Sequence, residues 1–230
     1  MEDIMKRSYY LGFILFMGLI AGLNYLVELN AYTPSVPDET LPVSLTEKEA
    51  FKIMDFPINP ITLEEHCVNQ AQERITCHQL SNIQTGDILV SKSSHTLLFR
   101  HGHAGLVIDA DEGLVLEARG YGATSMLLSL DEWNYFPTVK VLRLKNANPE
   151  LIEKVVETAT TNYLDLPYNI FAMKTTLTST HCSDIVWKIF NDLGYDLDAT
   201  GGFFVTPQDL VTSPYLYEVA SYGFSDQRPW

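Results

Sequence analysis

The stretch FRHGHAGLVIDADEGLVLEARG, residues 99–120, contains two runs of β-prone residues on either side of an acidic turn. These runs, residues 103–109 and 113–119, predict the two strands of one antiparallel hairpin. Because side chains alternate between the two faces of a strand, one face of this hairpin would be wholly apolar and would pack on the core. Its members would be Ala104, Leu106, Ile108, Leu114, Leu116 and Ala118.

The opposite face of the hairpin carries His103, Gly105 and Glu117. A short loop around the acidic turn would place His103 directly opposite Glu117, with Cβ atoms about 5 Å apart. Gly105 would leave open space beside them. A histidine held by a carboxylate is the base half of a nucleophilic site, although an ordinary cross-strand His–Glu pair has the same appearance. This interpretation therefore needs a nucleophile.

Cys182, in the segment HCSDIVWKIF, is the candidate nucleophile. The apolar positions that follow it predict a helix with one buried face, and Cys182 lies in the first turn of that helix. Free backbone N–H groups and the positive end of the helix dipole stabilise a thiolate there, and the same N–H groups can bind an oxyanion. The alternative is a buried structural cysteine, but such residues usually lie on the apolar stripe in the middle of a helix.

Further segments predict an α+β fold, in the order helices, antiparallel strands, helices. Residues 86–91 and 138–144 are expected to be strands, a long helix is expected from Pro149, and the Cys182 helix is expected to end at Gly194. A turn and a last strand are expected within residues 206–221. Capping-box pairs, Thr46 with Glu49 and Thr62 with Glu65, predict two more helices near the start of the domain. The second would separate Cys67 and Cys77 by about 15 Å, so a disulfide between them would require this helix to break.

The first 45 residues are expected to lie outside the folded domain. Residues 1–7 contain Lys6 and Arg7, and residues 8–27 are uncharged and long enough to span a bilayer. This order predicts a cytoplasmic N-terminus and an extracytoplasmic domain of residues 46–230, joined by a proline-containing linker of residues 28–45. An uncleaved signal-anchor is favoured over a removed signal peptide, because Leu29 stands where a cleavage site needs a small residue. Cleavage would make the domain a secreted one.

The charge balance argues against a nucleic-acid partner. The chain has 29 acidic and 15 basic residues and a formal net charge of −14. Neutralising phosphates requires a basic face, and the basic residues here are scattered along the chain.

Six motifs occur in one order: GDILV, GHAGLVI, VLEARG, LPYN, HCSDIVW and VTPQDLVTSP. Over about residues 80–220 this series resembles the permuted papain-like amidases of the YaeF/YiiX type, in the NlpC-like superfamily. The resemblance implies a circularly permuted papain-like fold, an antiparallel sheet packed against helices, in which the histidine strand precedes the cysteine helix. It further implies Cys182 as nucleophile, His103 as base and Glu117 as orienting residue, with no cofactor.

Three residues are predicted to bind substrate beside this site. His101 is expected in a loop next to His103, and the resemblance implies that Tyr168 of LPYN lies beside the cleft. His181 stands where the family often has tyrosine, a difference that bears on substrate preference. A zinc site built from His101, His103, Glu117 and Cys182 is an alternative, but the turn-like RHGH favours a loop histidine and no metal.

The predicted function is that of a membrane-anchored thiol hydrolase that cleaves an amide bond, for example in a cell-wall peptide. The substrate would be a peptide, an amide or an acyl compound. Two alternatives remain at this stage: an acyltransferase or lipid hydrolase acting near the membrane, and an inactive binding module that has kept the fold.

Overall fold

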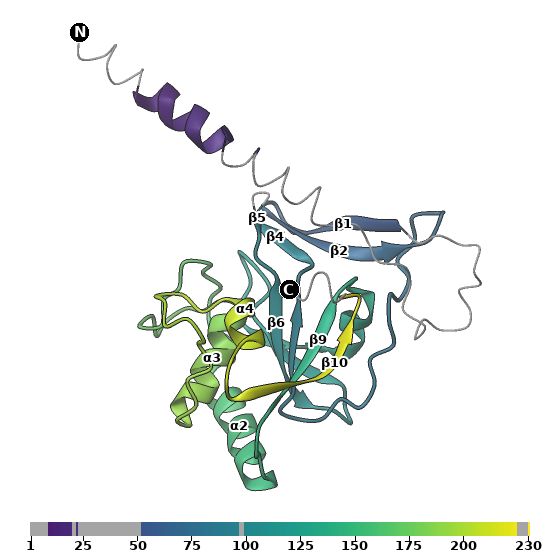
Figure 1. The fold of residues 1–230 in the computed structure, drawn as a ribbon, viewed down its shortest axis with the longest axis vertical. Coiled ribbons are helices and arrows are strands. Elements are labelled where there is room, and N and C mark those ends of the chain that lie inside the picture. The colour runs from purple at the N-terminus through teal and green to yellow at the C-terminus, as the bar shows by residue number, and fades with distance from the viewer. Residues whose placement is uncertain (1–8, 20–21, 23–51, 97–98, 225–229) are drawn as a thin grey trace.

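The computed structural model describes residues 9–19, 22, 52–96, 99–224 and 230, which include two antiparallel sheets (Figure 1). The larger sheet has the strand order β10-β9-β3-β6-β7-β8, and the smaller has the order β1-β2-β4-β5. The strands are β1 (Lys52–Asn59), β2 (Thr62–Val68), β3 (Ile88–Ser91), β4 (Ser94–Thr96), β5 (Phe99–Arg100), β6 (His103–Asp109), β7 (Leu114–Glu117), β8 (Met126–Ser129), β9 (Val139–Leu144) and β10 (Leu216–Tyr222). The helices are the 3-10 helix η1 (Leu130–Tyr135), α2 (Pro149–Asn162), α3 (Cys182–Asp192) and α4 (Pro207–Val211).

The six-stranded sheet buries apolar residues on both of its faces. On one face, Leu106 and Leu116 pack in a cluster with Ile185 and Phe190 of α3 and with residues of α2. On the other face, Val107 and Val115 pack in a second cluster with Trp133 of η1, with Phe136 and with Tyr222 at the end of β10. Figure 1 shows α2 and α3 together on one side of this sheet. The four-stranded sheet lies above it in this view, at the end away from α2. The central strand β6 is therefore covered on both faces, which holds its side chains in fixed positions.

The central strands and the two long helices confirm the sequence-based prediction. Asn148 accepts a hydrogen bond from the backbone N–H of Leu151 and so caps α2, whose first residue is Pro149. The chain leaves α3 through Gly194, which has a φ of 89°, a left-handed conformation that favours glycine. These segments were predictable because their capping residues and their periodicity agree with their packing.

The register of the β6–β7 hairpin differs from the predicted one by two residues. Glu117 pairs with Gly105, whereas His103 pairs with Ser91 of β3. The turn causes this shift, because the Asp109 side chain accepts the backbone N–H groups of two turn residues and the register is irregular beside it. A shift of two residues keeps every side chain on its predicted face, so His103 and Glu117 still share one face.

The two helices predicted from capping boxes near the start of the domain are wrong where the structure describes them. Residues from Lys52 onward form β1, and the segment that was expected to become the second helix forms β2 and a loop. Instead of a capping box, Asn59 accepts the backbone N–H groups of Ile61 and Thr62 and so forms the turn between the two strands. Nearly every residue of β2 is buried, and burial on both faces outweighs helix propensity. The first predicted capping box, Thr46 with Glu49, lies outside the described residues.

Because the predicted second helix does not form, Cys67 and Cys77 can meet. Their Cα atoms are 5.5 Å apart and their sulfur atoms form a disulfide. The chain that follows Cys67 turns back, with the backbone N–H of Ile75 donating to the carbonyl of Cys67. The disulfide therefore fastens the end of β2 to the loop that leads into the larger sheet.

Within residues 206–221, the structure contains a short helix that the sequence pattern did not predict. Thr206 and Asp209 form a reciprocal capping box that starts α4, where only a turn was expected. The expected last strand is confirmed as β10, which pairs with β9 at the edge of the sheet.

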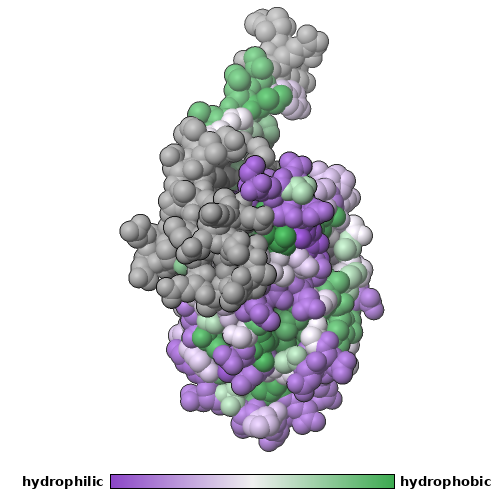
Figure 2. Space-filling view, turned by 90° about the vertical axis from the view of Figure 1, so that its right-hand side faces the viewer, coloured by the Kyte–Doolittle hydropathy of each residue, from purple (hydrophilic) through white to green (hydrophobic). Residues whose placement is uncertain are grey.

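Residues 9–19 are helical, and their large apolar side chains are exposed; they include the green segment in the upper part of Figure 2. Within the described part of the chain, no helix combines the length and the apolar character needed to cross a membrane. The remainder of the segment 8–27, which was predicted to be a membrane anchor, lies largely outside the described residues, as does the linker 28–45.

Candidate active site

His103 is the first residue of β6, and the glycine before it allows the strand to start there. Gly102 has a φ of 77°, and a Cβ atom at this position would lie 2.5 Å from the carbonyl oxygen of Ser91. No other residue could adopt this backbone conformation so close to β3. His103 is 2 % exposed.

Glu117 and Trp133 hold the His103 ring from two directions. Nε2 of His103 is 2.6 Å from Oε2 of Glu117, and Nε1 of Trp133 donates to Oε1 of the same carboxylate at 2.8 Å. The indole also stacks on the imidazole, with ring centroids 5.4 Å apart and planes inclined by 19°. With Nε2 held by Glu117, Nδ1 is the ring nitrogen left for Cys182.

The space beside Gly105, which was expected to be open, is filled by Trp133. A Cβ atom on Gly105 would lie 3.0 Å from Cζ2 of Trp133 and 2.7 Å from Cγ1 of Val115. Glycine is therefore needed here to admit the indole. The cavity described below is lined by neither Gly105 nor Trp133. The sequence contained one signal for this arrangement, since the indole N–H of a buried tryptophan needs an acceptor.

Cys182 is the first residue of α3, and its side chain is 5 % exposed. The side chain of His181, the residue that caps the helix, accepts no hydrogen bond from the backbone N–H groups of the first turn, so these groups remain available to an oxyanion. Burial alone would raise the pKa of the Cys182 thiol. The hydrogen bonds and positive charges of His103 and His181 outweigh burial and hold this pKa well below its usual range.

The pKa of His103 moves in the opposite direction. Burial lowers it, but hydrogen bonds with Cys182 and with Glu117, together with their negative charges, raise the pKa of His103 to about 10. At neutral pH the pair is therefore a thiolate and an imidazolium. A thiolate of this kind attacks carbonyl carbon without first losing a proton, and the imidazolium can protonate a leaving group.

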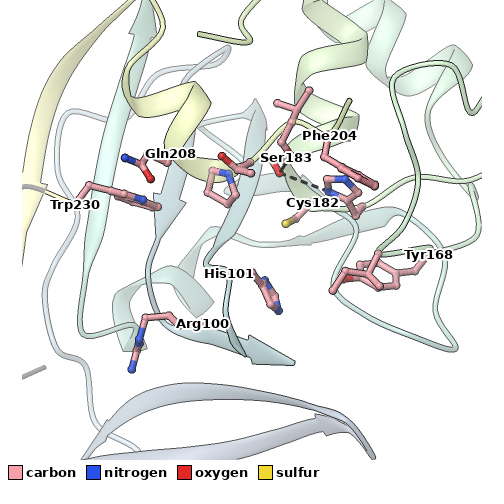
Figure 3. Close-up of a pocket in the computed structure, with 13 residues that line it drawn as sticks. Arg100, His101, Tyr168, Cys182, Ser183, Phe204, Gln208 and Trp230 are labelled. Atoms are coloured by element: carbon pink, nitrogen blue, oxygen red, sulfur yellow. Dashed lines mark hydrogen bonds between the residues drawn. The ribbon is translucent and has the colours of Figure 1, made fainter. Parts of the chain in front are cut away.

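A cavity of about 370 Å³ opens beside Cys182. In Figure 3, Tyr168 and Phe204 lie on one side of Cys182, whereas Trp230 and Arg100 lie on the other. The walls of the cavity come from the segments around 168–170 and 204–208, from the start of α3 and from the chain just before β6. The lining residues are Arg100, His101, Tyr168, Ile170, His181, Cys182, Ser183, Phe204, Val205, Thr206, Pro207, Gln208 and Trp230.

All three residues that were predicted to bind substrate line this cavity, namely His101, Tyr168 and His181. Burial and the charge of Cys182 raise the pKa of Tyr168, so its hydroxyl stays protonated and can donate a hydrogen bond. Nδ1 of His181 is 3.5 Å from the hydroxyl of Ser183. The cavity therefore offers both hydrogen-bonding groups and apolar walls.

His101 has partners for both ring nitrogens, which the sequence analysis did not assign. Nδ1 is 2.6 Å from the carbonyl oxygen of Gly102, so it must carry the proton, and Nε2 is 2.8 Å from the hydroxyl of Thr96. Burial lowers the pKa of His101, and a neutral ring fits both contacts. A ring held in this way has no lone pair directed at Cys182 or His103, so His101 does not complete the alternative zinc site.

Among the described residues, Asp55, Glu65 and His95 lie close enough together to suggest a metal site. Arg100 donates to both carboxylate oxygens of Glu65, at 2.8 and 2.9 Å. The guanidinium thus occupies the position that a cation would take.

A buried cysteine at a helix start, facing a histidine from the preceding sheet, is the arrangement of papain-like cysteine enzymes in permuted order. The chain belongs to the permuted papain-like amidase family of the YaeF/YiiX type, the C92 family, whose model matches residues 82–220. Its activity class is accordingly that of an amidase-type hydrolase, for which peptides or amides are the substrates.

The crystal structure of the metalloprotein yiiX from Escherichia coli O157:H7 is similar to this chain, with 21 % sequence identity and a TM-score of 0.48. The similarity covers 60 % of this chain and 96 % of that one. No curated protein sequence matches the chain. The strands β1 and β2 precede the residues matched by the family model.

Proposed function

We propose that this protein is a membrane-anchored, extracytoplasmic thiol hydrolase that cleaves an amide bond in a cell-wall peptide or a related amide. The observation that carries this proposal is the chain of contacts Cys182–His103–Glu117, with the thiol at the wall of a cavity. A structural cysteine would gain nothing from a buried imidazolium and an open pocket.

In the proposed mechanism, the Cys182 thiolate attacks the carbonyl carbon of the substrate. The first-turn N–H groups of α3 bind the oxyanion that forms. His103 then donates its Nδ1 proton to the leaving amine, and the C–N bond breaks to leave a thioester. His103, now neutral, takes a proton from water, which attacks the thioester and releases the acid and the thiolate. Glu117 keeps Nε2 protonated throughout.

The test is a hydrolysis screen of the full chain in detergent micelles. Short peptide amides and acyl esters of matched chain length are offered to the wild-type protein and to Cys182→Ala. We expect release of amine from the peptide amides by the wild-type protein, and none by Cys182→Ala. Absence of hydrolysis across the panel, with a reactive Cys182, would contradict the proposal.

A lipid hydrolase or acyltransferase is the second candidate, and the apolar cavity walls favour it. Ile170, Phe204 and Trp230 line the cavity, and Phe203 beside it is 80 % exposed. An acyl chain buries well against such walls. Turnover confined to the acyl esters in the screen supports this candidate over the amidase, whereas an inactive binding module turns over neither class.

The extracytoplasmic placement rests on two features. Lys6 and Arg7 precede an uncharged segment, an order typical of a cytoplasmic N-terminus, and Cys67 and Cys77 form a disulfide, which persists in oxidising compartments. We expect the protein in the membrane fraction and accessible to protease added outside the cell. Recovery from the cytosol would contradict this placement, and a soluble form that begins near residue 32 would indicate cleavage instead.

A further inference from the structure

A row of buried and partly buried charges continues from the candidate active site into the smaller sheet. Nη2 of Arg119 donates to Oε2 of Glu64 at 2.6 Å, and Nε of Arg119 donates to Oε1 at 3.3 Å. The same Nε atom lies 3.9 Å from Oε2 of Glu117, the oxygen that contacts His103. Arg119 thus stands between two carboxylates, in closer contact with Glu64.

Glu64 is completely buried, and it lies on β2, before the residues that the family model matches. A buried carboxylate is costly unless it is paired, and Arg119 supplies the pairing here. Burial by itself raises the pKa of Glu64, but His66, Arg119 and the charge of His103 lower it to about 2. Glu64 is therefore negatively charged at any pH at which the protein works.

We propose that Glu64 is a positioning residue: by binding Arg119, it keeps this guanidinium from displacing His103 at the carboxylate of Glu117. The inference deepens the proposed function, because it concerns the same histidine base. It also gives the hairpin of β1 and β2 a part in the site.

The physical argument is a competition for one oxygen atom. Arginine stays charged at all working pH values and seeks a carboxylate in bidentate geometry. If Glu64 lost its charge, the nearest carboxylate would be Glu117, whose Oε2 would then be shared between Arg119 and His103. Glu117 would then stabilise the imidazolium less, and the direct attraction between Glu64 and His103 would also be lost. Both changes lower the pKa of His103.

Other titratable groups also face this network and contribute to the same balance. His66 lies against Glu64, Glu132 acts on Arg119, and His101, His181 and Tyr168 surround the histidine and the thiol. None of them changes in the variants below, so differences between the variants report on Glu64 and Arg119.

The experiment follows the His103 ring by NMR, in the full chain with ¹³C-labelled histidine in micelles, between about pH 6 and pH 11. His103→Gln assigns the signal. We expect the wild-type midpoint near 10 and, for Glu64→Gln, a midpoint lower by about one pH unit. The double variant Glu64→Gln/Arg119→Met, which lacks the competing cation, should return to the wild-type midpoint.

The matched control is Asp87→Asn. Asp87 is also completely buried and binds Arg143 through both oxygens, at 2.6 and 2.8 Å. It makes no contact with the candidate site, so its variant should keep the wild-type midpoint even if it loses stability. This separates a specific effect of Glu64 from the general cost of breaking a buried ion pair.

An unchanged midpoint in Glu64→Gln, or a lowered midpoint in the double variant, would overturn the proposal. If Glu64→Gln does not fold, Arg119→Met decides, because removing a cation beside Glu117 must leave the midpoint at or above the wild-type value. A lowered midpoint in Arg119→Met overturns the proposal. The measurement uses no substrate, so it stands apart from any failure to detect hydrolysis.

Discussion

Cys182→Ala and His103→Ala are each expected to reduce turnover of the substrate found in the screen by on the order of 10⁴-fold or more. The first variant removes the atom that forms the thioester. The second removes the imidazolium that lowers the thiol pKa and supplies the proton for the leaving group. Because the two groups act as one unit, the double variant should be no slower than either single variant. Steady-state kinetics of the three proteins measures this.

His101→Ala is the control for this pair. His101 lines the cavity but is held by Thr96 and Gly102, so its loss should raise KM and leave kcat close to the wild-type value. A His101 variant as inactive as His103→Ala would refute the assignment of the base.

Iodoacetamide should inactivate the wild-type protein by alkylating Cys182 alone, since Cys67 and Cys77 are in a disulfide.

Glu117→Gln is expected to lower kcat/KM by roughly 10²- to 10⁴-fold, although it preserves the shape of the side chain. Both oxygens of Glu117 accept hydrogen bonds, one from Trp133 and one from His103. A glutamine has only one acceptor oxygen. If the indole N–H takes that oxygen, the amide NH₂ group faces Nε2 of His103 and moves the ring proton to Nδ1. The neutral ring then presents an N–H group to the thiol, and it cannot act as a base there.

Trp133→Phe supplies a rescue that tests this explanation. Phenylalanine has no N–H group, so the glutamine oxygen of the double variant Glu117→Gln/Trp133→Phe is free to turn towards His103. The double variant should be roughly tenfold more active than Glu117→Gln alone, whereas Trp133→Phe alone should cost little, because the carboxylate keeps its bond to the imidazole. A double variant slower than Glu117→Gln would show that the indole acts by packing and not through its hydrogen bond.

The parts of the fold that could be predicted are those where local pattern and packing agree. The alternation in residues 103–109 and 114–117 defined the faces of β6 and β7, and the same face assignment brought His103 and Glu117 together despite the shifted register. Cys182 was found because a nucleophile at a polar helix start stands apart from the buried stripe of that helix. Each of these inferences depends on neighbours in the chain or on one hairpin.

The parts that could not be predicted depend on contacts between distant segments. The capping-box pair Thr62 and Glu65 indicated a helix, but β2 is stabilised by pairing with β1 and β4, which this local pattern does not encode. Trp133 reaches Glu117 only because η1 folds back over the sheet, and Glu64 reaches Arg119 only because the two sheets meet. Glu117 itself was predicted, whereas Trp133 and Glu64, which surround it, became visible only in three dimensions.

The division of the site between the sheet and the loops has a consequence for protein engineering and for evolution. His103, Glu117 and Trp133 lie in the sheet or in the helix η1 that packs on it, whereas Ile170, Phe204 and many of the other cavity walls belong to loops. The loop that carries Phe204 is attached to the start of α3, because the hydroxyl of Ser183 donates to the carbonyl of Val205. Substitutions at wall positions such as Ile170 and Phe204 can therefore alter which compound fits without changing the residues that hold His103.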